Sequence, residues 1–220
     1  RRGGRALSPG QRLGPLEIAA AATCGATRLR VFRQPRVGVL VTGDELVPVE
    51  ATPTGAEIRD SNRWMLEALA REHGAEPVVL GSAIDDRAAL RAAITRAADC
   101  DLLCITGGVS VGAFDFVPEV LAEAGAVFHI RKMAIKPGKP VIFATMPGGQ
   151  IVFALPGNPI SAFVGFQLLV RPALTALEGR LGEAPSFLRA RLAGALAAAG
   201  KRRSFRPAQV SVTPDGDLVA

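Results

Sequence analysis

Apolar runs of strand length alternate along the middle of the chain with segments in which apolar residues recur at helical spacing. The pattern predicts strands at residues 37–42, 77–84, 101–106, 126–133, 141–144 and 151–155. It predicts helices over residues 62–73, 86–97, 117–124 and 159–178. Because most of the strands are apolar throughout, we expect helices to cover both faces of their sheet. The prediction is an α/β fold, a three-layer sandwich around a mostly parallel sheet.

The two ends of the chain have a different pattern. Residues 1–36 are rich in Pro, Gly and Arg and include a short Ala-rich helix at about residues 16–24. Beyond residue 186 the pattern alternates at 188–192 and 205–212, and Pro214-Asp-Gly216 is typical of a hairpin turn. Fewer than 40 residues are too few for a separate core. We therefore divide the chain into residues 1–36, a helical linker segment; 37–182, the α/β domain; and 183–220, the truncated start of a C-terminal β domain.

Composition narrows the function classes. Hydrophobic residues make up 49% of the chain, which excludes disorder, and the net charge of +6 alone favours a polyanionic partner. Residues 1–36, however, carry 8 Arg against one Glu, whereas residues 37–180 have a net charge of −4. We therefore expect no nucleic-acid partner. Three sparse cysteines favour a reducing, cytoplasmic location with Cys100 and Cys104 buried. No apolar run approaches a membrane span of about 18–20 residues, so we expect no membrane partner.

Two strand-to-helix loops have residues suited to anions. In a doubly wound sheet, ligands bind beyond the carboxyl ends of the strands. The loop at 106–112 contains three glycines, whose backbone can approach an anion closely, and Ser110 adds a hydroxyl. The turn at 155–161 places Asn158 as a helix N-cap, with Ser161 in the first turn of a helix whose amino end attracts anions. A tight turn and a plain helix cap remain the alternative interpretations of these two loops.

Charged side chains cluster at the same strand ends. The chain has four lysines, and Lys136 and Lys139 share one loop framed by prolines, where two ammonium groups could bind an oxyanion. Carboxylates follow three strands: Asp44 and Glu45, then Asp85 and Asp86, then Asp115. Helix capping explains Asp85 or Asp86 and can explain Asp115. Carboxylates beside phosphate-binding loops would repel a polyphosphate unless a divalent ion such as Mg²⁺ lay between them.

These motifs together resemble one family. Residues 42–46, 60–62, 106–112 with Asp115, 134–140 and 155–162 are similar, in the same order, to the molybdopterin molybdenumtransferases. This is the MoeA family, shared with the C-terminal part of gephyrin, and its α/β domain is MoaB/MogA-like. The resemblance implies that adenylylated molybdopterin and molybdate are converted to molybdenum cofactor with release of AMP, dependent on Mg²⁺.

The resemblance also implies roles for individual residues. The catalytic set would be Glu45, Asp85, Asp86, Asp115, Lys136 and Lys139. Of these, Glu45, Asp86 and Asp115 would hold the metal. Residues expected to bind substrate are Thr42, Gly43, Asp44, Gly107, Gly108, Ser110, Gly112, Pro137, Gly138, Pro140, Pro156, Gly157, Asn158 and Ser161. Ala113 stands where family members often have an acidic residue.

The family further implies a β-rich domain before residue 1, a longer C-terminal β domain, and a homodimer that shares its sites between subunits. A molybdopterin adenylyltransferase is an expected partner enzyme. Two alternatives remain: this chain is itself a molybdopterin adenylyltransferase, or a non-catalytic scaffold like gephyrin. Adenylylation of molybdopterin with MgATP would indicate the first. Cofactor maturation unaffected by Glu45→Ala or Lys139→Ala would refute the site assignment.

Overall fold

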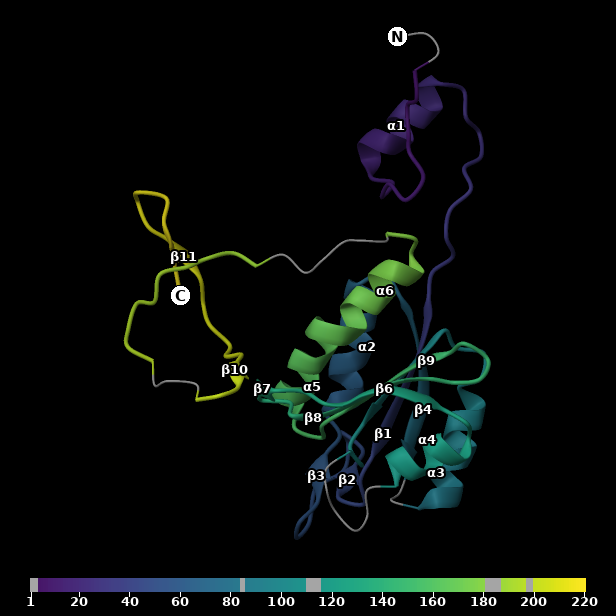
Figure 1. The fold of residues 1–220 in the computed structure, drawn as a ribbon, viewed down its shortest axis with the longest axis vertical. Coiled ribbons are helices and arrows are strands. Elements are labelled where there is room, and N and C mark those ends of the chain that lie inside the picture. The colour runs from purple at the N-terminus through teal and green to yellow at the C-terminus, as the bar shows by residue number, and fades with distance from the viewer. Residues whose placement is uncertain (1–3, 84–85, 110–115, 181–186, 197–199) are drawn as a thin grey trace.

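A six-stranded sheet forms the centre of the molecule (Figure 1). The computed structural model describes residues 4–83, 86–109, 116–180, 187–196 and 200–220. In spatial order the strands are β4 (Glu76–Ala83), β1 (Arg36–Thr42), β5 (Leu102–Thr106), β9 (Ile151–Leu155), β8 (Pro140–Thr145) and β6 (Val127–Lys132). The first four are parallel, and β8 runs antiparallel to both of its neighbours. The predicted α/β fold with a mostly parallel sheet is confirmed.

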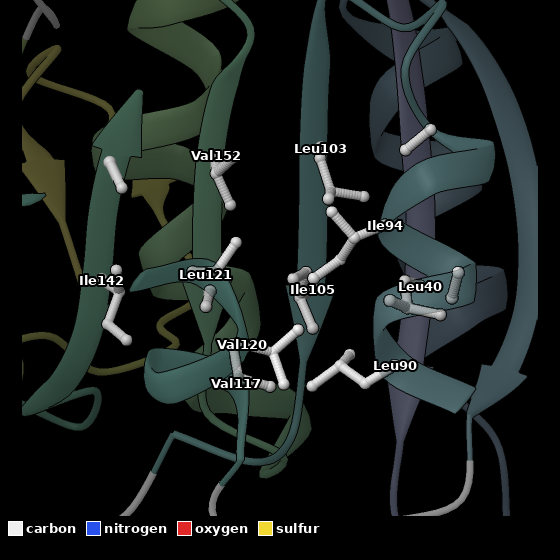
Figure 2. Close-up of a cluster of buried hydrophobic side chains, with 14 of the residues drawn as sticks. Leu40, Leu90, Ile94, Leu103, Ile105, Val117, Val120, Leu121, Ile142 and Val152 are labelled. Carbon is white, nitrogen blue, oxygen red and sulfur yellow. The ribbon is translucent and has the colours of Figure 1, made fainter. Parts of the chain in front are cut away.

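Helices cover both faces of this sheet, as the apolar strands predict. One face carries α3 (Arg87–Arg96) and α4 (Val117–Glu123), and Figure 2 shows their apolar side chains meeting those of the strands. The opposite face carries α2 (Asn62–Glu72) and a continuous helix made of α5 (Pro159–Gly165), a π-helical turn η1 (Phe166–Val170) and α6 (Arg171–Leu177). Two hydrophobic cores therefore hold the strands, and hence their loops, in place.

The helix Pro159–Leu177 corrects one expectation. With 19 residues, it is long and apolar enough to cross a membrane by length and composition, although the sequence analysis expected no such run. Phe166, Val170 and Leu174 are buried against the sheet in the second core. A core helix passes the same test, because burial against a sheet also selects apolar side chains.

In the described parts of the chain, three short two-stranded ladders lie outside the central sheet. Within a segment predicted to be a loop, β2 (Leu46–Val47) pairs with β3 (Ile58–Arg59). A second pair joins β7 (Ile135–Lys136) to β10 (Arg203–Ser204). The third, β11 (Ser211–Val212) with β12 (Leu218–Val219), is antiparallel and confirms the predicted hairpin.

The alternating positions at 188–192 do not form a strand longer than one bridge. In the described part of this region only an isolated bridge joins Arg191 to Val219. Leu188 is 82% exposed and Leu192 54% exposed. Alternating apolar residues form a strand only where a packed surface takes up one face, and these two side chains have none.

The N-terminal segment contacts the α/β domain at the amino end of the sheet. It contains α1 (Pro15–Thr23). The ring of Phe32 lies so close to Gly179 that a Cβ on this glycine, whose φ is +78°, would be 2.2 Å from the ring. Arg33 forms a bidentate ion pair with Asp101, which also accepts a hydrogen bond from the Arg36 amide. These contacts anchor the segment beside the first strand.

Candidate functional site

The loops with unusual residues meet at the carboxyl edge of the sheet. Strands β1, β4, β5 and β9 are parallel, so the segments that follow them leave at the same edge. The 136–139 loop follows β6, which runs in the same direction as β9. Hydrogen bonds join neighbouring loops, from Gly43 N to Ala83 O and from Gly107 N to Leu155 O. Residues from five separate parts of the sequence therefore share one edge.

Gly107 and Gly108 form a tightly enclosed turn against β1. Their φ angles are +90° and +61°. A Cβ on Gly107 would lie 2.2 Å from the Thr42 carbonyl oxygen and 2.6 Å from its Oγ1, and one on Gly108 would lie 2.8 Å from Val117 Cγ2. Both the backbone conformation and the available space thus require glycine. The loop continues through Ser110, Gly112, Ala113 and Asp115, which lie outside the described residues.

The turn between β9 and α5 is organised by Asn158. Its Oδ1 accepts a hydrogen bond from the Ser161 amide at 3.3 Å, and its carbonyl accepts one from the Ala162 amide at 2.9 Å. Pro159 has no amide hydrogen. Among the described residues, the Ile160 amide is therefore the one N–H of the first helical turn that has no hydrogen-bond acceptor. The predicted N-cap is confirmed. Fewer backbone amides are therefore free to bind an anion than at an uncapped helix amino end.

The lysine loop lies against the start of α5. Gly138 is buried with a φ of +98°, and a Cβ there would be 3.5 Å from the Ser161 carbonyl oxygen. Lys136 and Lys139 are exposed. Hydrogen bonds from Met133 N to Lys139 O and from Phe205 N to Lys136 O hold the two ends of the loop. Both ammonium groups are therefore carried by a braced loop that touches the Ser161 turn.

The carboxylates have different surroundings. Glu45 is exposed and folds back over Gly43, since a Cβ on this glycine would be 2.6 Å from Glu45 Oε2. Asp86 caps α3 by accepting a hydrogen bond from the Ala89 amide at 2.8 Å. Asp85, like Asp115, lies outside the described residues. Among the residues that are described, no three His, Cys, Asp or Glu side chains gather as a metal site.

Two buried polar groups at this edge were missed by the sequence analysis. Asn62 is 7% exposed, and its Nδ2 donates to the Gly157 carbonyl oxygen at 2.7 Å. Its Oδ1 and the Oγ1 of the fully buried Thr106 have no hydrogen-bond partner within the described ranges. Asn62 belongs to the motif at residues 60–62, in which Asp60 accepts a hydrogen bond from the Arg63 amide at the start of α2. The available signal was that three side chains able to cap a helix, Asp60, Ser61 and Asn62, stand side by side where one would suffice.

Within the described residues, cavities also lie at the other edge of the sheet. One of about 700 Å³ separates the N-terminal segment from the ends of α2 and α6, and includes Arg12, Arg30 and Phe32 in its lining. Another of about 550 Å³ lies near Cys100 and Gln150. Neither is lined by the residues of the carboxyl-edge loops.

Cys104 is fully buried, as predicted, and burial raises the pKa of its thiol to about 12.

A glycine turn, a helix start and a lysine loop at the carboxyl edge define a doubly wound α/β domain suited to an anionic ligand. The chain belongs to the family described as probable molybdopterin binding domains, which matches residues 38–176. A molybdopterin molybdenumtransferase of Nostoc sp. is 38% identical over 207 residues, which are 92% of this chain and 48% of that protein. A Staphylococcus aureus protein of the same name is 35% identical over 214 residues, which are 97% of this chain and 51% of that protein.

Solved structures agree on the fold. A molybdopterin biosynthesis MoeA protein from Pyrococcus horikoshii superposes with a TM-score of 0.78 at 34% identity, covering 97% of this chain and 52% of that one. A structure titled molybdenum cofactor biosynthesis protein B covers 69% of this chain and 98% of its own, with a TM-score of 0.51 at 16% identity, and shares the fold. The chain thus spans about half the length of the molybdenumtransferases that it matches.

Proposed function

We propose that the carboxyl-edge site takes part in molybdenum insertion, in which molybdate and adenylylated molybdopterin yield molybdenum cofactor with release of AMP. The observation that carries the proposal is the contact between the lysine loop and the Ser161 turn, beside the Gly107 turn. Both substrates are anions. The relatives at 35% and 38% identity, which bear the name molybdopterin molybdenumtransferase, support the same reaction.

Each part of the site has a separate task in this proposal. Lys136 and Lys139 attract molybdate and offset the charge that develops on the departing phosphate, because cations held in place by a braced loop stabilise such charge. The Gly107–Gly108 turn lets the phosphate groups approach the backbone closely. The Ile160 amide and the buried hydroxyl of Ser161 complete the donor set. From the sequence motif, we add Ser110 and Gly112 to this set of donors.

We include a bound Mg²⁺ in the proposal, with three carboxylates as its candidate ligands. Glu45 lies at the end of β1 with its side chain exposed, and is the first candidate ligand. Asp86 has one oxygen committed to the α3 cap, which leaves the other for a metal. Asp115 is the third candidate ligand and comes from the sequence motif, whereas Asp85 is kept as a further catalytic carboxylate. A bound Mg²⁺ would shield substrate phosphates from these carboxylates. The protein side chains would orient the anhydride between this acidic group and the lysines.

Variants of the lysine loop and of Glu45 test the proposal in the whole protein. We expect Lys139→Ala and Glu45→Ala each to lower the rate of molybdenum cofactor formation at least about 100-fold, as for other lost electrostatic donors. Lys132→Ala and Glu72→Ala are matched controls, since both residues are exposed and neither is assigned to the site. They should change the rate less than twofold. Equal rates for all four variants and the parent protein would refute the site.

We further propose that the protein acts as a cytoplasmic homodimer, receives its adenylylated substrate from a molybdopterin adenylyltransferase, and requires neither nucleic acid nor a membrane. The mildly acidic balance of residues 37–180 supports the absence of a nucleic-acid partner. Sedimentation at several concentrations tests the dimer directly.

A further inference from the structure

The amide of Asn62 joins two of the loops at the carboxyl edge. Asn62 is the first residue of α2, and its Nδ2 donates to Gly157 O at 2.7 Å across 95 residues of sequence. A backbone carbonyl only accepts hydrogen bonds, so this contact fixes which end of the amide faces Gly157. The side chain is buried, and its orientation is therefore set by the turn that it holds.

A series of short hydrogen bonds continues from Asn62 to Glu45. The Ile58 amide donates to Glu45 O at 2.8 Å, and the Asp60 amide donates to Val47 O at 2.9 Å. The Asp60 carboxylate in turn accepts from the Arg63 amide at 3.0 Å, which fixes the start of α2. The segment that carries Glu45 is thus connected through the start of α2 to the turn that carries Ser161.

Burial of the Asn62 amide lowers the stability of the fold. Asn62 Oδ1 is buried and has no partner within the described residues, and such groups are costly. Gly157 is exposed, so its carbonyl could bond to water if Asn62 were absent. Polar groups kept at such a cost are typical of sites where position matters more than stability.

We propose that Asn62 is a positioning residue that holds the Pro156–Ser161 turn in register with the Glu45 loop. The inference rests on the proposed function for its effect on catalysis, whereas its effect on the turn is independent of any substrate. Loss of the bond would let the Ser161 turn shift relative to the Glu45 loop. Displacements of about 1 Å can cost about 100-fold in rate.

Hydrogen exchange and kinetics of Asn62→Ala and Asn62→Asp test this role in the whole protein. We expect the Ser161 and Ala162 amides to exchange about 5- to 10-fold faster in both variants, and kcat/KM to fall about 10- to 100-fold. The melting temperature of Asn62→Ala should change by less than about 4 °C, because one weak bond and one unpartnered atom are lost together. Asn62→Asp keeps the shape but places a second acceptor against Gly157 O, so it should be the worse variant.

Gln150→Ala is the matched control. Its Nε2 donates to the Cys100 carbonyl at 2.9 Å at the other edge of the sheet, and its loss should leave both the exchange and kcat/KM unchanged. Unchanged exchange in both Asn62 variants would overturn the proposal, as would a loss of activity that only follows a large loss of stability. If Asn62→Ala does not fold, Asn62→Ser, which keeps a short uncharged polar side chain at this position, decides. If the parent protein forms no cofactor, the proposed function fails while the exchange data still decide the role of Asn62.

Discussion

Replacement of Gly107 by alanine tests the tight turn between β5 and the adjoining glycine loop. The substitution adds a single methyl group at a φ of +90°. That group would lie 2.2 Å from Thr42 O and 2.6 Å from Thr42 Oγ1, whereas real contacts of this kind are rarely closer than 3.0 Å. The carboxyl ends of β1 and β5 must therefore separate, because the main obstacle is backbone and not a flexible side chain.

The magnitude follows from two separable costs. A left-handed backbone costs a non-glycine residue about 1–2 kcal/mol. Relieving an overpacked contact adds about 1–3 kcal/mol. The expected loss in the free energy of unfolding is therefore about 2–5 kcal/mol, which for a chain of this size corresponds to about 4–20 °C in melting temperature.

Gly149→Ala supplies the matched control. Gly149 has a similar φ of +83°, but nothing lies within 4 Å of its added Cβ, so this variant carries only the backbone cost. Urea denaturation of the two variants and the parent protein, monitored by circular dichroism, measures the difference. If Gly107→Ala is no less stable than Gly149→Ala, within about 0.5 kcal/mol, the close approach of the Gly107 turn to Thr42 is refuted.

Two further predictions concern other parts of the molecule. Burial opposes ionisation of Asp101, but the hydrogen bonds from Arg33 and Arg36 and their charges outweigh it and hold the pKa of this carboxyl below its usual range. Its contribution to stability is then present above pH of about 4 and is lost as the pH falls through the folded-state pKa. Asp101→Asn should therefore lower the free energy of unfolding at pH 7, and this deficit should shrink as the pH falls below about 4; a deficit that stays constant down to the lowest pH at which the protein is folded would contradict the assignment. Incubation with molybdopterin and MgATP should yield no adenylylated product by chromatography, and such a product would make the chain an adenylyltransferase.

Local sequence signals predicted most of the α/β fold. Strand β9 was predicted with its observed bounds, and Asn158 was predicted as the N-cap of the helix that follows. Such features depend on residues within one turn or one strand, where apolar periodicity and capping chemistry act directly. The convergence of strand-end loops at one edge then follows from the parallel order of the sheet.

Contacts between distant segments were not predictable in the same way. Strand β2 pairs with β3 across a loop of ten residues, and β10 pairs with β7 from beyond residue 200. The bond from Asn62 to Gly157 likewise joins residues 95 positions apart. Local pattern contains no information on such pairings, because they arise only when the whole sheet is assembled. The mean hydropathy of the helix Pro159–Leu177 was underestimated for a different, local reason. Its apolar run is interrupted by Gly165, Gln167, Arg171 and Pro172, so no single run is long.

A crystal structure of the whole protein with molybdate and AMP tests the central proposal most directly. We expect both anions at the carboxyl edge, within hydrogen-bond distance of Lys136 or Lys139, the Ser161 hydroxyl and the backbone of the Gly107 turn. Both anions bound instead in the arginine-lined cavity beside Phe32, or no bound anion at saturating concentrations, would contradict it.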